Sequence, residues 1–158
     1  RLWSMQNKYL DKKNKNIMHM INGTKVDIQN ILWIYRLKLY YNVEPEKMYS
    51  YLIPINYKLT KEQIVKMVES RTMEELKNEI ATTKYGKYFA DDDNLDKIGT
   101  NILKDVYDRA VHLSPNSIAV IVSYIFYKEL ELHNVISLLE GVRYKLEPDK
   151  IMDYLVVK

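Results

Sequence analysis

The sequence predicts an all-α fold, on three observations about its residues. The chain holds only four glycines and four prolines in 158 residues, and so few turn formers favour long regular elements. Apolar residues recur at helical spacing in several segments, and no segment shows sustained alternation bounded by hairpin turns. Hydrophobic residues make up 47% and charged residues 28% of the chain, as in ordinary globular proteins. We therefore expect a single contiguous helical body.

One part of the sequence resembles another. Residues 30–52 can be aligned with residues 134–155 when one residue is inserted. The alignment pairs Asn30 with Asn134, 43–48 with 146–151 and 51–52 with 154–155. Similarity at a fixed offset, here 103 or 104 residues, indicates a repeated helical unit. The offset predicts the C-terminal part of one repeat at 1–54 and a complete repeat at 55–158. We therefore expect the chain to start in mid-repeat and its parent to be longer toward the N-terminus.

An apolar stripe predicts the first long helix. Its members lie three, four, seven and eleven positions after the first: Ile28, Ile31, Leu32, Tyr35 and Leu39. Pro45 follows a glutamate and is suited to the first position of a short helix, since a proline there loses no helical hydrogen bond. The same arrangement returns at Pro148 in the second copy.

Two capping-box sequences predict two helices in the middle of the chain. Thr60 with Gln63 opens one and Thr72 with Glu75 opens the next, because each hydroxyl can accept an N–H while the later side chain bonds back. Their apolar stripes are Ile64, Met67 and Val68, then Met73, Leu76 and Ile80. Connectors are expected at 54–59 and 85–94.

Two further helices are expected in the C-terminal half. The run Asp91-Asp92-Asp93 suits the positive end of a helix from about Leu95 to Leu113. Ser114 before Pro115 predicts the start of the longest helix, which would run to about Tyr144 with a bend near Gly141. The longest apolar stretch, 118–127, is ten residues long, whereas a membrane-spanning helix needs about 20.

The patterns that carry catalytic or metal chemistry are missing from the sequence. The four glycines are isolated and form no phosphate-binding loop. His19, His112 and His133 lie too far apart to make a helical metal pair. A calcium loop starting at Asp91 would need a glycine at its sixth position, where Asp96 stands. We expect no cofactor, no metal site and no catalytic residue, so the protein is not expected to be an enzyme.

Charge and tyrosine content leave one alternative open. Residues 1–90 carry 16 Lys+Arg against 9 Asp+Glu, and residues 91–158 carry 8 against 12. The basic N-terminal region would allow a helical adaptor that binds nucleic acid or protein through Lys8, Lys12, Lys13 and Lys15. The 14 tyrosines would either pack between helices or stack on bases.

Asn30 and Asn134 are the polar residues that the repeat singles out. Asparagine is a mediocre helix former, so its place at matching helical positions suggests a role for the side chain. That role is either structural, a hydrogen bond that ties one helix to another segment, or contact with a partner.

Three strings carry a resemblance to a known family. They are 27–38, 52–59 and 124–144, the last with the core Lys-Glu-x-Glu-x-x-Asn. Together and in this order they resemble the C subunit of bacterial and archaeal A/V-type ATPases, known as the d subunit in eukaryotic vacuolar ATPases. The resemblance runs nearly end to end and would cover about the C-terminal half of a family member. It implies an all-α funnel of three similar helical repeats, of which this chain would hold one and a half.

The same resemblance implies a non-catalytic role in a rotary motor. The protein would couple the D and F subunits of the central stalk to the membrane rotor ring during proton or sodium transport. It would lie on the cytoplasmic face of the membrane as a peripheral part of the complex, without a span of its own and without binding nucleic acid. Charged and amide positions that the resemblance marks as a candidate interface are Asn30, Arg36, Lys38, Glu129, Glu131, Asn134 and Arg143.

Overall fold

A computed structural model describes residues 8–41, 43–90 and 94–156, and every regular element within these ranges is helical. The predicted all-α class is therefore confirmed. The chain divides into two compact units, Arg1–Val106 and Tyr107–Lys158. The division falls inside a helix, whereas the predicted repeat boundary lies between residues 54 and 55. The repeat boundary describes correspondence in sequence rather than packing, and it stays a prediction.

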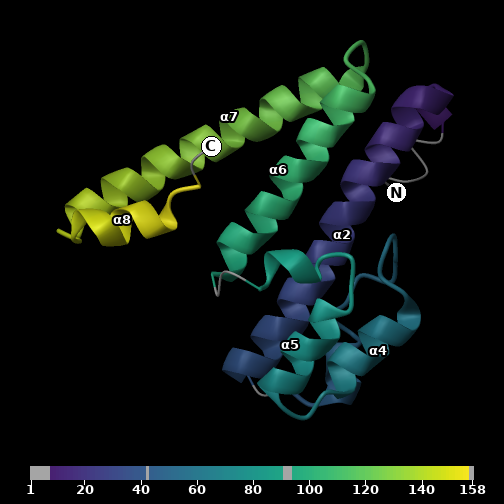
Figure 1. The fold of residues 1–158 in the computed structure, drawn as a ribbon, viewed down its shortest axis with the longest axis vertical. Helices are drawn as coiled ribbons and strands as arrows, with labels where there is room; N and C mark the ends of the chain where they lie inside the picture. The colour runs from purple at the N-terminus through teal and green to yellow at the C-terminus, as the bar shows by residue number, and fades with distance from the viewer. Residues whose placement is uncertain (1–7, 42, 91–93, 157–158) are drawn as a thin grey trace. The chain divides into compact units, whose positions relative to one another are not determined.

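The first unit is built on one long helix (Figure 1). Helix α2 spans Lys12–Tyr41, 30 residues, and the shorter helices α4 and α5 pack against it. The remaining elements follow in chain order: α3 (Pro45–Met48), α4 (Lys61–Glu69), α5 (Met73–Ala81), the 3-10 turn η1 (Gly86–Tyr88) and the start of α6 (Leu95–Leu113).

The core of the first unit gathers around the predicted stripe of α2. Ile31 and Ile34 are fully buried, and they share one apolar cluster with residues of α3, α4, α5 and α6. The members from those helices are Met48, Ile64, Met67, Val68, Leu76, Ile80, Leu95, Ile98 and Ile102. Gly99 lets α6 approach α2 closely, since a Cβ there would lie 3.2 Å from a methyl group of Leu32. Burial of this cluster is the main stabilising term of the unit.

The helix starts of α4 and α5 follow the predicted capping chemistry to different extents. Thr60 forms the complete capping box: its hydroxyl accepts the Gln63 N–H at 3.1 Å, and Gln63 accepts the Thr60 N–H at 3.0 Å. Thr72 accepts the Glu75 N–H, but the Glu75 carboxylate accepts the N–H of Arg71 instead of that of Thr72. Only half of the second box is therefore present.

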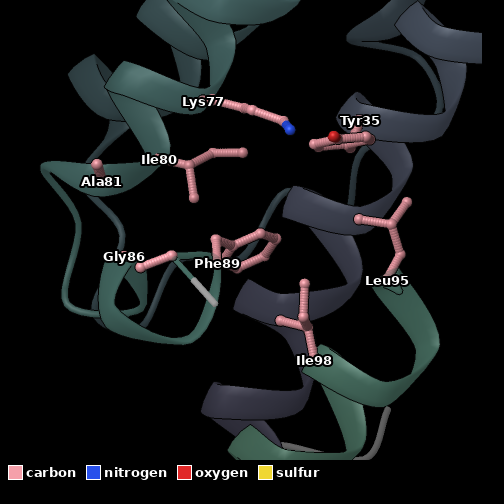
Figure 2. A pocket seen from close by; sticks show the side chains of 9 residues that line it. Tyr35, Lys77, Ile80, Ala81, Gly86, Phe89, Leu95 and Ile98 are labelled. Atoms are coloured by element: carbon pink, nitrogen blue, oxygen red, sulfur yellow. The ribbon is translucent and has the colours of Figure 1, made fainter. Parts of the chain in front are cut away.

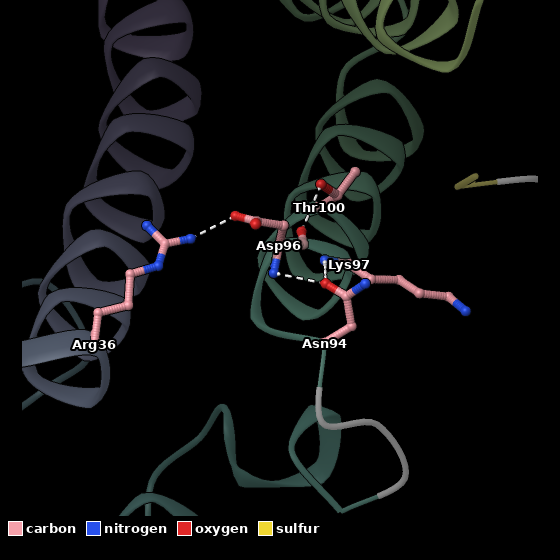
Figure 3. Close-up of polar contacts among 5 residues, drawn as sticks. All are labelled: Arg36, Asn94, Asp96, Lys97 and Thr100. Atoms are coloured by element: carbon pink, nitrogen blue, oxygen red, sulfur yellow. Dashed lines mark hydrogen bonds and ion pairs between the residues drawn. The ribbon is translucent and has the colours of Figure 1, made fainter. Parts of the chain in front are cut away.

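Helix α6 begins with an asparagine cap (Figure 3). The Asn94 side-chain oxygen accepts the N–H groups of Asp96 and Lys97 at 3.1 and 3.2 Å. These are two of the unpaired donors that every helix N-terminus presents. The run 91–93, which was expected at this helix start, lies outside the described residues.

The second unit consists of the end of α6, helix α7 (Ile118–Arg143) and helix α8 (Pro148–Tyr154), with α8 packed against α7 (Figure 1). Helix α7 does not start at Pro115 as predicted, because Ser117 supplies the cap and accepts the Ala119 N–H at 3.1 Å. The same hydroxyl donates to the Ser114 carbonyl, which closes the turn before the helix. The helix continues through Gly141 to Arg143.

Candidate functional site

Asn30 fastens α2 to the segment that follows α3. It is fully buried, its side-chain N–H donates to the Ile53 carbonyl at 3.0 Å, and its side-chain oxygen accepts the Ile53 N–H at 2.9 Å. One amide thus satisfies both backbone hydrogen-bonding groups of Ile53. The Asn30 side chain is occupied inside the chain and is not displayed to a partner.

Asn134 makes the same pair of bonds in the second unit. It donates to the Val156 carbonyl at 3.0 Å and accepts the Val156 N–H at 3.1 Å. The alignment of the two copies pairs Ile53 with Val156, one position beyond its last matched residues. The geometry at both asparagines favours the structural alternative, a tie between a long helix and the chain that returns along it.

Asp27 is a structural anchor that the sequence patterns did not single out. It is fully buried, and its carboxylate accepts the N–H groups of Tyr57, Lys58 and Leu59 at 3.0, 2.6 and 3.2 Å. It also accepts the Tyr85 hydroxyl at 2.8 Å. A buried carboxylate needs such donors to offset its desolvation. The available signal was its position three residues before Asn30, on the same face of the helix.

Arg36 and Lys38 both bind partners within the first unit. Figure 3 shows the Arg36 guanidinium reaching the carboxylate of Asp96 on α6. The Lys38 ammonium donates to the carbonyls of Val68 and Ser70 at 2.8 and 2.6 Å, at the C-terminal end of α4. A cation is stabilised there by the helix dipole and the unpaired carbonyls. Burial lowers the pKa of Lys38 despite the nearby Glu75 carboxylate.

The candidate residues of the second unit, apart from Asn134, lie on the surface of α7. Glu129, Glu131 and Arg143 are exposed. Glu131 accepts a bond from Lys128 at 2.6 Å, which raises the pKa of that lysine. The Arg143 guanidinium lies 5.9 Å from the ring centre of Tyr144. All three charged side chains therefore lie on one helix, α7, and Glu131 also lines an open groove there.

A small pocket in the first unit lies between α2, α5 and the start of α6. Its volume is about 70 Å³, against roughly 300 Å³ or more for ligand sites. Figure 2 shows Phe89 and Ile80 facing its interior, with the ends of Lys77 and Tyr35 at one side. Within the described ranges no three His, Asp or Glu side chains are placed to hold a metal ion.

A helix that crosses a bilayer must be both long and apolar. Among residues 8–41, 43–90 and 94–156, no helix meets both requirements.

Comparison with known proteins agrees with the resemblance seen in the sequence. The profile of the ATP synthase (C/AC39) subunit family matches residues 1–154. The C subunit of the A-type ATP synthase of Methanosphaera stadtmanae is 29% identical over 136 residues, a match that covers 77% of this chain and 34% of the relative. The chain thus spans about a third of the length of the curated relative it matches. Because the family profile covers nearly all of it, this chain belongs to the ATP synthase (C/AC39) subunit family.

Proposed function

We propose that the protein is a non-catalytic central-stalk subunit of a rotary A/V-type ATPase. It couples the D and F subunits of the shaft to the membrane rotor ring during proton or sodium transport, on the cytoplasmic face of the membrane. The observation that carries this proposal is the family match over residues 1–154. The printed name of the relative, an A-type ATP synthase subunit, supports it.

The packing of the first unit supports a mechanical role. A part that transmits torque must resist local opening, and closely packed helices joined by buried polar ties deform little. Along α2, three side chains bond backbone groups of later segments: Asp27 holds the turn before α4, Asn30 holds Ile53, and Lys38 holds the end of α4. Each tie joins segments 23 to 32 residues apart.

The exposed charges of α7 are the part of the predicted interface that a partner could reach. Glu129 and Arg143 are on the surface, and exposed charges at a rim set the rate and specificity of docking more than its strength. We therefore assign contacts with the shaft or the ring to these residues rather than to Asn30. The Arg36 side chain is about one-third exposed and is paired with Asp96. It could contact a partner subunit only by breaking that ion pair.

Binding to the isolated shaft tests the proposal. The full-length protein is mixed with purified D–F subunits, and complex formation is followed by size-exclusion chromatography and titration calorimetry at low and moderate salt. We expect a stable one-to-one complex at low salt. Failure to bind at low salt would overturn the proposal.

An oligonucleotide titration serves as the control in the same buffers. The adaptor alternative uses Lys8, Lys12, Lys13 and Lys15, and phosphate contacts would make its affinity fall steeply with salt. Salt-dependent oligonucleotide binding without shaft binding would favour the adaptor. We expect no measurable oligonucleotide binding at moderate salt.

A further inference from the structure

Helix α7 carries an exposed apolar seam along most of its length. The seam residues follow one another in alternating steps of four and three, which is the heptad spacing of helices that pair side by side. All but one of them are apolar, and the apolar members are between 48% and 64% exposed. The seam consists of Ile121, Ile125, Lys128, Leu132, Val135, Leu139 and Val142. A face this apolar and this continuous marks a contact surface.

The opposite face of α7 is already packed within the second unit. Ser123, Phe126 and Gly141 are buried there. Tyr107 of α6 stacks on Phe126 with ring centres 4.3 Å apart, and the Ser123 hydroxyl donates to the Tyr107 carbonyl at 3.3 Å. Helix α8 lies so close that a Cβ at Gly141 would be 2.7 Å from Ile151 (Figure 1). The end of α6 and helix α8 therefore fill one side of α7 and leave the seam uncovered.

Two opposite charges flank the seam at equal distances from Ile136. Glu129 lies seven residues before it and Arg143 seven residues after it, so all three share one edge of the heptad pattern. Both charges are exposed, and within the described ranges neither of them is in an ion pair. If two copies of α7 pair antiparallel with Ile136 on the two-fold axis, Glu129 of each copy meets Arg143 of the other. The symmetry forms this ion pair twice.

The same charges select one register for such a pair. With Ile136 on the axis, four apolar layers lie between the two helices, and each layer packs a seam leucine against a seam valine of the other copy. A shift by one heptad places Glu129 opposite Ile136 and loses the ion pairs. A shift by two heptads places Glu129 opposite Glu129, where like charges repel. Of these three registers, only the first combines apolar layers with opposite charges.

We propose that the seam of α7 is the interface of a symmetric antiparallel dimer of this chain. The two helices overlap over residues 131–143, about 20 Å of helix, so the interface is small and the dimer forms reversibly. It covers Glu129 and Arg143, the residues assigned above to contacts with the shaft or the ring. The inference goes beyond the coupling role, because it concerns the free chain, whose dimer must separate before those contacts form.

Sedimentation of the whole 158-residue chain tests the interface. We expect a monomer–dimer equilibrium in the micromolar range. Glu129→Arg and Arg143→Glu should each weaken association by about tenfold or more, because each places like charges opposite one another. The double variant Glu129→Arg/Arg143→Glu should restore association, since the ion pairs form again with their signs exchanged. Lys150→Glu reverses an exposed charge on α8 and is the matched control, which should dimerise like the original chain.

A single cysteine locates the two-fold axis, because the chain has no cysteine of its own. In the proposed dimer the two Ile136 side chains face each other, so Ile136→Cys should give a disulfide-linked dimer under mild oxidation. The two Ile121 side chains would lie about 45 Å apart. Ile121→Cys, the same exchange on the same seam, should therefore stay unlinked. Electrophoresis without reducing agent compares the two variants.

The dimer is refuted if the original chain stays monomeric at every concentration. It is equally refuted if the single charge reversals leave association unchanged, if the double variant associates no better than they do, or if cysteines at positions 136 and 121 cross-link alike. Circular dichroism of each variant shows that the helices are intact. None of these measurements includes the shaft or the ring, so a negative result leaves the proposed function to its own test.

Discussion

Asp27 places one carboxylate inside the turn that follows α3, and much of the first unit depends on it. Three neighbouring backbone N–H groups and the Tyr85 hydroxyl donate to it. A segment without regular structure must satisfy its backbone donors in some way. Here a single side chain from α2 does so, and the segment is thereby fixed against the helix.

Removal of the Asp27 carboxylate should destabilise the folded protein strongly. We predict that Asp27→Ala lowers the free energy of unfolding by about 3–5 kcal/mol, because it leaves several buried donors without acceptors. Urea denaturation followed by circular dichroism measures the change. The matched control is Glu131→Ala in the same chain, which removes an exposed carboxylate and should leave the urea midpoint nearly unchanged. Equal losses in the two variants would contradict the assigned role of Asp27.

Tyr85 makes the stability of the first unit sensitive to alkaline pH. Burial, with a further contribution from the Asp27 carboxylate, raises the pKa of Tyr85 above its ordinary value of 10.0. The folded state then holds the phenolic proton more tightly than the unfolded state does. The contribution of Tyr85 to the free energy of unfolding is therefore complete below pH 10. It is lost progressively as the pH rises above that value.

The expected signature is a difference in pH dependence between two proteins. Between pH 9 and pH 11 the free energy of unfolding of the native sequence should fall by about 1 kcal/mol more than that of Tyr85→Phe. Urea titrations at the two pH values measure it. If the free energies of unfolding of the two proteins fall in parallel, the Tyr85 hydroxyl has the same pKa in the folded and the unfolded state.

At the scale of elements, the end of α7 shows how a long helix is stopped. Lys145 has a φ of 54°, in the left-handed region, and its N–H donates to the Val142 carbonyl. The Leu146 N–H donates to the Gly141 carbonyl at 3.0 Å. These two bonds form a Schellman motif, whose left-handed position favours glycine. Lysine there carries strain that α7 tolerates because the chain must turn back into α8.

A glycine at this position should stabilise the second unit. We predict that Lys145→Gly raises the free energy of unfolding by about 0.5–1 kcal/mol, since glycine adopts a positive φ without the steric cost of a Cβ. Tyr144→Gly, one position earlier where φ is −85°, is the control and should destabilise, because glycine gains nothing at a negative φ. The measurement is thermal unfolding of both variants. A loss of stability in Lys145→Gly would show that this end of α7 is not built as described.

Helix positions could be predicted from sequence where the signal is local, and less well where two local signals compete. Thr60 and Gln63 satisfy each other across three residues, so α4 starts where the capping box predicts. Ser114 and Ser117 could each cap α7, and Ser117 does so while bonding the Ser114 carbonyl. A proline at a favourable position does not settle such a competition.

The same distinction holds for the candidate site. Asn30 and Asn134 could be found because the chain repeats the residue, although the sequence did not say which atoms they would bind. The partners of Lys38 are backbone carbonyls 30 and 32 residues away along the chain. Every residue has a carbonyl, so such partners leave no pattern in a sequence. Asp27 was missed for a similar reason, since a single carboxylate in a helix is more often solvated than buried.

At the scale of the whole molecule, the chain consists of two helical units. Each unit holds an asparagine that ties its long helix to a later segment of the same unit. It belongs to the ATP synthase (C/AC39) subunit family, and its proposed role is to transmit torque without a reaction of its own. The role therefore has to be tested in the assembled motor. A protein that transmits torque sets how many ions are transported for each ATP that is hydrolysed.

The most direct measurement compares ATP-driven ion transport and ATP hydrolysis in membrane vesicles whose rotary ATPase contains or lacks the full-length protein. If the protein couples the shaft to the ring, removal should abolish transport while the soluble head continues to hydrolyse ATP. Adding the protein back should restore transport, and the protein alone should hydrolyse no ATP. Transport that persists at an unchanged ion-to-ATP ratio in its absence would contradict the coupling role.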